Sequence, residues 1–187
     1  PSIEQLEAEI RRIDSAPRRR GGFALRLTLA IIIVAAAALI LAASLIFPVL
    51  RISGTSMGRT LSSGDIVAAV KTDELERGDI IAFSCNGMIL VKRVIALPGE
   101  VIDISADGTV TIDGSALSEP YLTTKSLGSL SIELPYTVPQ GEYFVMGDNR
   151  AVSSDSRSAE VGCVSAGQVL GRLAVRLWPL GSIGAVE

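Results

Sequence analysis

The longest hydrophobic feature of the chain is an uncharged run near its N-terminus. No residue from Leu27 to Leu50 carries a charge, and a helix of this length covers about 36 Å. The hydrocarbon core of a bilayer is about 30 Å thick, so the run predicts one transmembrane helix at residues 27–50. A cleavable signal peptide has a shorter apolar region, and a buried core helix is seldom apolar on every side.

The segment before this run combines an amphipathic pattern with basic residues. Apolar residues at positions 3, 6, 10 and 13 follow the spacing of one helical stripe, and SAPRRRGG at residues 15–22 then predicts a basic linker. Basic residues are concentrated on the cytoplasmic side of membrane spans. We therefore expect residues 1–26 to be a cytoplasmic amphipathic and basic segment, and the chain from Arg51 onward to lie outside the cytoplasm.

Beyond Arg51 the hydrophobic pattern changes to short runs that are typical of strands. Turn-forming pairs at residues 107–108 and 113–114, both Asp-Gly, separate some of these runs and predict tight hairpins. Residues 51–187 therefore predict a mainly β domain of antiparallel sheets, either a sandwich or a partly open, barrel-like structure. Weak alternation in residues 115–140 predicts either a long surface excursion or an inserted piece with little core of its own, and we place this excursion or insertion around residues 101–140.

Charge and the absence of histidine narrow the functions that this domain can have. Seven of the 17 basic residues and four of the 20 acidic residues lie in residues 1–51, which leaves a net charge of −6 on the remainder. This acidity argues against a nucleic-acid partner. With no histidine and no Cys-x-x-Cys motif, a Ser-His-Asp triad is excluded, and we expect neither a metal site nor a cofactor. Cys85 and Cys163 could pair in an extracytoplasmic space, but their spacing leaves this open.

In the stretch MILVKRVIAL, residues 88–97, a lysine lies among aliphatic residues. Side chains alternate between the two faces of a strand, so Lys92 shares its face with aliphatic side chains. Burial disfavours the ammonium form and lowers the pKa of a lysine, which would make Lys92 a base at neutral pH. The alternative is that its ammonium group reaches water from the edge of a strand. Lys71 and Lys125 lie in polar segments and are not candidates.

A candidate nucleophile lies in SGTSMGRTL, residues 53–61. The glycines around Ser56 allow a turn that exposes its hydroxyl and points its backbone N–H at a developing oxyanion. Such a stretch is also typical of a juxtamembrane linker. Met57 favours the catalytic interpretation, because we expect its apolar side chain to be exposed beside Ser56 and close to the bilayer surface.

A third stretch, GDNRAVSSDSR at residues 147–157, is dense in polar and charged residues. It predicts a rigid, hydrogen-bonded loop in which Asp155 and Arg157 are available as an ion pair. A calcium-binding loop is the alternative, but the stretch lacks the alternating acidic residues and the terminal glutamate of that motif.

These three stretches, in this order, resemble the motifs of the bacterial type I signal peptidases, which are membrane-anchored Ser-Lys proteases. The resemblance covers residues 27–179 and rests on SGTSMGRTL, KRVIALPGE and GDNRAVSSDSR. It implies that Ser56 is the nucleophile and that its own N–H is one oxyanion donor. It also implies that Lys92 is the general base and that Ser153 hydrogen-bonds to this lysine and orients it.

The resemblance extends to residues that support the site, although four positions depart from the family pattern. In the second motif Ala96 stands where glycine is common and Glu100 stands in place of aspartate, and both changes are tolerable. Gly54 stands where some members have a serine that supplies a second oxyanion donor, and Arg59 stands where proline is usual. The supporting residues implied by the resemblance are Gly54, Met57, Gly147, Asp148, Asn149, Arg150, Asp155 and Arg157.

The resemblance also implies the substrate and the location. Secretory preproteins with small residues at positions −1 and −3 would bind as an added β-strand, and membrane lipid is the other expected partner. The catalytic domain would lie outside the plasma membrane of a bacterium, behind a single span with a cytoplasmic N-terminus. The alternative is a catalytically silent relative that serves as a scaffold in surface-fibre assembly. Such relatives are expected to lose the serine or the lysine, and this chain has both.

Overall fold

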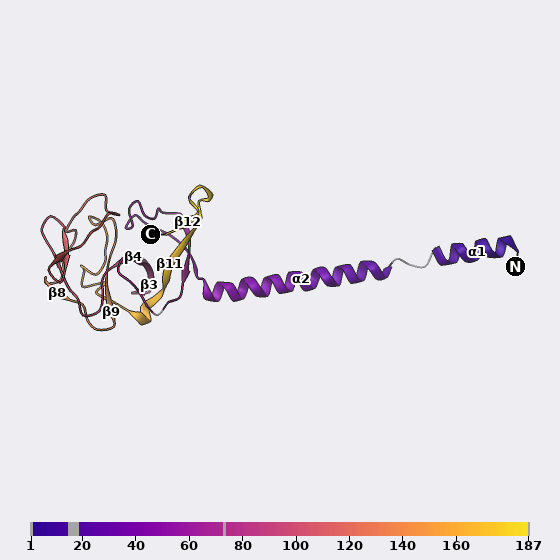
Figure 1. The fold of residues 1–187 in the computed structure, drawn as a ribbon, viewed down its shortest axis with the longest axis horizontal. Coiled ribbons are helices and arrows are strands. Elements are labelled where there is room, and N and C mark those ends of the chain that lie inside the picture. Colours follow the sequence, from indigo (N-terminus) through magenta and orange to yellow (C-terminus); the bar gives the residue numbers. More distant parts are fainter. Residues whose placement is uncertain (1, 15–18, 73, 187) are drawn as a thin grey trace. The chain divides into compact units, whose positions relative to one another are not determined.

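The computed structural model describes residues 2–14, 19–72 and 74–186, and the chain divides into two units at residues 1–43 and 44–187. The first unit holds helix α1 (Ile3–Asp14) and most of helix α2 (Arg19–Ile46) (Figure 1). Helix α1 follows the predicted amphipathic stripe. The predicted linker at 15–22 is wrong over residues 19–22, which are helical, and residues 15–18 lie outside the described residues.

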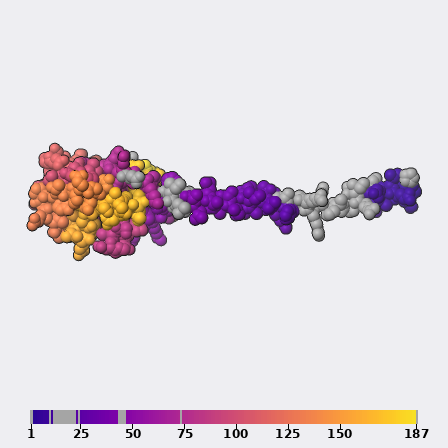
Figure 2. All heavy atoms as spheres, turned by 90° about the horizontal axis from the view of Figure 1, so that it is seen from below, coloured from indigo at the N-terminus to yellow at the C-terminus, as the bar shows by residue number. Residues whose placement is uncertain are grey.

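Helix α2 contains the segment that is apolar enough to cross a membrane. Over the 18 residues Leu25–Ala42 the mean hydropathy is 2.6, and none of this window is buried inside the protein (Figure 2). The helix begins at Arg19 and ends at Ile46, so it includes residues 27–46 of the predicted span 27–50, and residues 47–50 are not helical. Proline disfavours a helical conformation in the residue before it, and after Pro48 the chain enters a strand instead.

The second unit is built on an eight-stranded antiparallel sheet in the order β1-β2-β11-β3-β4-β9-β10, with β12 paired to β11 (Figure 1). In the described part of the chain β1 and β10 end this order, so the sheet is not closed into a barrel. The prediction of a mainly β domain with antiparallel sheets is confirmed. Two short 3₁₀ helices, Ala166–Gln168 and Leu180–Ser182, flank β11. The strands are β1 (Val49–Arg51), β2 (Ile66–Val70), β3 (Ile80–Cys85), β4 (Met88–Ala96), β9 (Glu142–Met146), β10 (Val164–Ser165), β11 (Val169–Trp178) and β12 (Gly184–Ala185).

A separate four-stranded sheet is formed between β4 and β9 in the chain. Its order is β7-β6-β5-β8, and its pairings are antiparallel. The two Asp-Gly pairs form the turns between β5 and β6 and between β6 and β7, as their sequence predicted. The strands are β5 (Val101–Ile104), β6 (Val110–Ile112), β7 (Ser115–Ala116) and β8 (Tyr136–Thr137).

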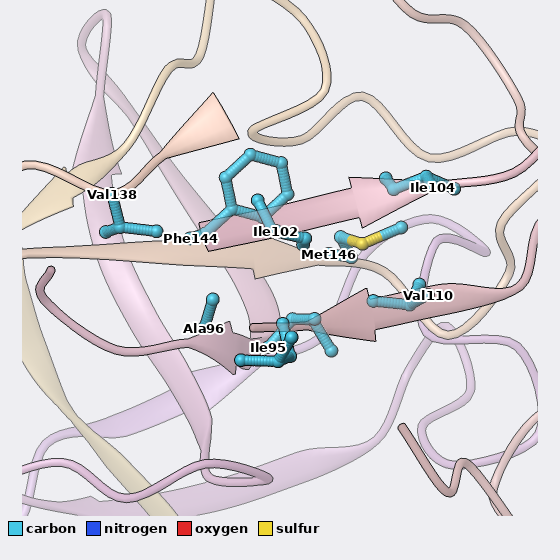
Figure 3. Close-up of a cluster of buried hydrophobic side chains, with 9 residues drawn as sticks. Ile95, Ala96, Ile102, Ile104, Val110, Val138, Phe144 and Met146 are labelled. Carbon is cyan, nitrogen blue, oxygen red and sulfur yellow. The ribbon is translucent and has the colours of Figure 1, made fainter. Parts of the chain in front are cut away.

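A buried hydrophobic cluster joins the two sheets (Figure 3). Ile95 and Phe144 from the large sheet meet Ile102 and Val110 from the small one, and each such side chain stabilises the fold by about 1.5–3 kcal/mol. The excursion at residues 115–140 also packs on this cluster, so its apolar side chains enter a core that both sheets share. Its contributing residues are Leu117, Tyr121, Leu127, Ile132, Leu134, Tyr136 and Val138.

Candidate active site

A cleft of about 170 Å³ lies between the segment that follows β1 and the middle of β4. Two polar side chains predicted from the sequence, Ser56 and Lys92, line this same cleft. Most of the remaining wall is aliphatic, so the cleft offers an apolar surface beside a hydroxyl and an amine. The aliphatic and thioether residues that line it are Leu50, Ile52, Met57, Ile89, Leu90 and Val91.

Ser56 lies in a tight turn that two glycines make possible. Gly54 has φ +93° and Gly58 has φ +56°, values that side-chain-bearing residues adopt only with strain. The backbone N–H of Gly58 donates to the carbonyl oxygen of Thr55 at 3.1 Å, and the N–H of Asn149 donates to the carbonyl oxygen of Ser56 at 2.9 Å. The turn is therefore tied to the loop at 147–157, while Ser56 itself stays partly exposed.

Met57 does not point outward as we expected from the sequence. Only 2% of its surface is exposed, and it packs with Leu61 and Val67 in a buried cluster beneath the turn. An apolar side chain next to an apolar core gains free energy by entering it. The prediction of an exposed Met57 at the bilayer surface is wrong, and its role is to anchor the turn that carries Ser56.

Lys92 is buried in β4, with 3% of its surface exposed, opposite Ile81 of β3. Its pKa is lowered, mainly because burial removes water from the ammonium form, and Arg157 lowers the pKa further. Asp155 and Asp148 act in the opposite direction without cancelling the effect of burial. The alternative interpretation, a lysine whose amine reaches water, is therefore wrong. The other two lysines of the chain, Lys71 and Lys125, are exposed.

Both carboxylates near Lys92 are engaged by arginines. Asp148 accepts hydrogen bonds from Arg93 Nε at 2.9 Å and from Arg93 Nη2 at 2.8 Å. Asp155 accepts from Arg157 Nε and Nη2, both at 2.8 Å. Neither carboxylate forms an ion pair with Lys92 among the residues that the structure describes. The amine therefore lacks a direct counter-ion, which agrees with its lowered pKa.

The order of the strands explains how these groups meet. Strands β4 and β9 are antiparallel, and Arg93 pairs with Met146 near the end of β9. The residues that follow Met146 therefore begin beside the residues that flank Lys92. Asp148 lies two positions beyond that pair, where Arg93 reaches it across a separation of 55 residues in the chain.

Asp155 anchors the loop that continues from Asp148. Burial alone would raise its pKa, but the hydrogen bonds and charge of Arg157, together with the Gly147 N–H, lower the pKa below the ordinary value. The Gly147 N–H donates to Asp155 Oδ2 at 3.0 Å, and Arg157 Nη1 donates to the carbonyl of Leu127 at 2.6 Å. The predicted Asp155–Arg157 ion pair is confirmed. Asp155 thus stays ionised and fixes the loop.

Ser153 is placed by this loop against the nucleophile turn. It is 4% exposed, and a methyl group added at Gly147 would lie 2.2 Å from Ser153 Oγ and 2.5 Å from the carbonyl oxygen of Ser56. The Ser153 hydroxyl lies close enough to Asp155 to help lower the pKa of that carboxyl group. Within residues 2–14, 19–72 and 74–186, however, no group meets the distance and angles of a hydrogen bond to Ser153 Oγ. A buried hydroxyl without such a partner is available to bond with a neighbouring group at the site.

Two further residues predicted to support the site hold the loop to other segments. Asn149 Nδ2 donates to the carbonyl of Thr55 at 3.2 Å. Arg150 forms an ion pair with Glu119 of the excursion, in which the side chains are 0% and 1% exposed. These contacts tie the loop to the turn that carries Ser56 and to the excursion.

The two cysteines and the possible metal ligands contribute no further site. Cys85 and Cys163 are both free thiols, which answers the question that their spacing left open. Burial raises the pKa of Cys163 to about 11, so this thiol is protonated at neutral pH. Among the described residues, no group of three or more His, Cys, Asp or Glu side chains is arranged to hold a metal ion.

Comparison with known proteins decides the family. A family model described as signal peptidase, peptidase S26, matches residues 24–178. The chain belongs to this signal peptidase family. It is 38% identical over 167 residues to a signal peptidase I of Bacillus licheniformis, covering 82% of this chain and 88% of that protein. It is 35% identical over 148 residues to signal peptidase IB of Staphylococcus aureus, covering 68% and 76%.

A solved structure of a signal peptidase I from Enterococcus faecalis V583 is also similar to this chain. The identity is 38%, with 54% of this chain and 97% of that chain covered, and the TM-score is 0.45. The family model and the two curated relatives confirm the resemblance found in the sequence motifs at the level of the family, and membership in this signal peptidase family implies peptidase activity.

Three residues near the candidate site make contacts that the sequence motifs did not indicate. The motifs assign no chemical role to Arg93, yet it binds Asp148. Glu119 and Tyr121 lie in a stretch with no clear periodicity, and nothing local indicates that they reach the loop at 147–157. A buried cation on an apolar strand requires a partner, so Arg93 carried a signal that a carboxylate must face it.

Two of the departures from the family pattern, Gly54 and Arg59, lie in the turn that carries Ser56. Gly54 adopts a left-handed φ of +93°, so a serine at this position would be strained in the observed turn. Arg59 is exposed on the surface of the turn, where the structure does not require the rigidity of a proline.

Proposed function

We propose that this chain is a signal peptidase I in which Ser56 is the nucleophile and Lys92 is the general base. The observation that carries the proposal is that a buried lysine, which has no direct counter-ion among the residues that the structure describes, lines the same cleft as a partly exposed serine. A nucleophile needs an adjacent base to remove its proton, and with no histidine in the chain Lys92 is the base that the cleft offers.

Burial supplies the chemical condition for this role. A lysine can accept a proton only as the neutral amine, and its ordinary pKa of about 10.4 makes that form scarce at neutral pH. Burial lowers the pKa of Lys92, while Arg93 and Arg157 occupy the carboxylates that would stabilise the ammonium form. The fold thus favours the neutral amine in the cleft.

The reaction then proceeds in two halves. Neutral Lys92 Nζ takes the proton from Ser56 Oγ, which forms a bond to the carbonyl carbon of the substrate, and the backbone N–H of Ser56 stabilises the resulting oxyanion. The C–N bond breaks as the ammonium group of Lys92 gives its proton to the leaving amine. In the second half Lys92 takes a proton from water, which attacks the acyl-enzyme, and the proton returns to Ser56 Oγ as the acid is released.

The lining of the cleft supports apolar side chains as its ligands. Aliphatic side chains of β1 and β4, such as Leu50 and Val91, form part of its wall, which suits the apolar residues expected at positions −1 and −3 of a secretory preprotein. Helix α2 would anchor the enzyme in a bacterial plasma membrane, in contact with lipid. The basic flank before it would keep the N-terminus in the cytoplasm, with the catalytic domain outside.

The decisive experiment incubates the purified full chain in detergent with a preprotein that has small residues at −1 and −3. We expect one cut directly after the −1 residue, located by mass spectrometry, and no cut by the matched variant Ser56→Ala. Cleavage by Ser56→Ala would contradict the assignment of the nucleophile. Failure of the parent protein to cut any such preprotein would favour the catalytically silent scaffold.

The rate is expected to depend on pH through Lys92. As pH falls below the lowered pKa of this amine, the neutral fraction and therefore kcat/KM should fall about tenfold per pH unit. The measurement is kcat/KM for a peptide substrate across the pH range in which the protein stays folded by circular dichroism. A rate that stays constant well below neutral pH would indicate a carboxylate base.

A further inference from the structure

The excursion sends two side chains, Glu119 and Tyr121, towards the loop that follows β9. The Glu119 carboxylate is buried and binds Arg150 through both oxygens. Tyr121 Oη donates a hydrogen bond to Glu119 Oε1 at 2.9 Å. The Arg150–Glu119 pair therefore fixes the position of the phenol group, although neither residue lines the cleft that contains Ser56.

The ring of Tyr121 in turn covers the guanidinium group of Arg93. Arg93 Cζ lies 4.0 Å from the centre of the ring, which is within the range of a cation–π interaction. Arg93 Nη1 also donates to the carbonyl of Gly78 at 2.8 Å, and Nε and Nη2 bind Asp148. The guanidinium is thus held by the ring on its face and by acceptors in its plane.

The far end of this series of contacts is Asp148, whose charge acts on Lys92. The charged groups that act on Lys92 are Asp155, Arg157 and Asp148 from the loop after β9, and Arg93 is its neighbour on β4. Asp148 is neutralised by Arg93 and also accepts a hydrogen bond from Thr60 Oγ1 at 2.5 Å. If Arg93 loses its position, the charge of Asp148 is less compensated and can stabilise the ammonium form of Lys92.

We propose that Glu119 and Tyr121 are positioning residues that hold Arg93 on Asp148 and so prevent Asp148 from acting as a counter-ion for Lys92. The inference rests on the proposed role of Lys92 as general base. It gives the excursion a function in catalysis, because residues far from Ser56 would then determine how much of the lysine is neutral. A merely structural role for Tyr121 would change stability without changing the pH at which the lysine loses its proton.

The test compares Tyr121→Leu, which removes both the ring and the hydroxyl, with Tyr121→Phe, which removes only the hydroxyl. In Tyr121→Leu we expect the acid limb of kcat/KM to move to higher pH by about half a unit to one unit, a loss of about three- to tenfold below the pKa. At high pH the rate should return towards that of the parent. Tyr121→Phe should show a smaller shift in the same direction, because the ring still covers Arg93.

The matched control is Tyr136→Leu. Tyr136 packs against the same hydrophobic cluster as Tyr121, but its aromatic neighbour is Phe144. We expect the Tyr136→Leu substitution to lower the melting temperature without shifting the acid limb of kcat/KM. An acid limb that stays in place in folded Tyr121→Leu would overturn the inference. If Tyr121→Leu does not fold, the comparison of Tyr121→Phe with Tyr136→Phe decides in the same way.

A measurement without turnover separates this inference from the proposed function. In the Ser56→Ala background, the pH dependence with which an amine-specific reagent labels Lys92, followed by mass spectrometry, reports the pKa of the lysine directly. Adding Tyr121→Leu should shift the labelling profile to higher pH, and an unchanged profile would contradict the inference. If Lys92 is not the base, Lys92→Met should keep its activity. That result would contradict the proposed function, whatever the labelling profile shows.

Discussion

Replacing Lys92 with methionine is expected to abolish peptide cleavage at every pH. Methionine has similar length and no basic atom, so the cleft keeps its shape and loses the group that takes the proton from Ser56. General-base catalysis contributes about 10²–10⁴ to a rate, and a base that serves both halves of the reaction should lie at the upper end. The measurement is kcat/KM for a small-residue peptide substrate from acid to alkaline pH.

The stability of this variant makes the prediction sharper. Lys92 is buried, and in the described part of the chain it has no direct counter-ion. Burying an uncompensated polar group has a cost in folding free energy. We therefore expect Lys92→Met to melt at the same temperature as the parent or higher, although it is inactive. Lys71→Met and Lys125→Met, at exposed positions, should keep full activity. More than a tenth of the parent rate in Lys92→Met would exclude lysine as the base.

Replacing Gly147 with alanine is expected to impair both folding and catalysis. The added methyl group would lie 2.2 Å from Ser153 Oγ and 2.5 Å from the carbonyl oxygen of Ser56, which is closer than atoms can approach. The turn with the nucleophile and the serine beside it must therefore move apart. Overpacking of this kind destabilises a protein by about 1–3 kcal/mol, and we expect a fall in kcat of about 100-fold, since small misplacements of reacting groups have effects of this size.

Gly167→Ala is the matched control for this variant. A methyl group at Gly167 meets no atom within 4 Å, and like Gly147 its backbone does not require a left-handed conformation. We expect its melting temperature and kcat to equal those of the parent. The measurements are the free energy of unfolding in denaturant and kcat, each for Gly147→Ala, Gly167→Ala and the parent. Equal activity in Gly147→Ala and the parent would show that the contact between this loop and the turn does not position Ser56.

The parts of the site that could be predicted from the sequence are those that local patterns determine. The aliphatic neighbours of Lys92 indicated burial, and the short spacing of Asp155 and Arg157 allowed an ion pair, which the structure contains. The strands and the Asp-Gly turns also follow from local preferences. Each of these features depends on residues that are close together in the chain.

The parts that could not be predicted depend on strand register and on tertiary packing. The partner of Arg93 is Asp148, which lies opposite only because β4 pairs with β9 in one particular register. The burial of Met57 depends on the core that forms beneath its turn. Glu119 reaches Arg150 because the excursion folds back onto a cluster shared by both sheets, and no local pattern contains that information.

Strand β1 has a consequence for the range of proteins that this enzyme could process. It ends the order of the large sheet, and the residues that continue from it line the cleft with Ser56. An open strand edge offers N–H and C=O groups that bond to the main chain of a peptide, which is the same for nearly every sequence. We expect recognition to depend on side chains only where they enter the cleft, so that one enzyme can accept many otherwise unrelated precursors.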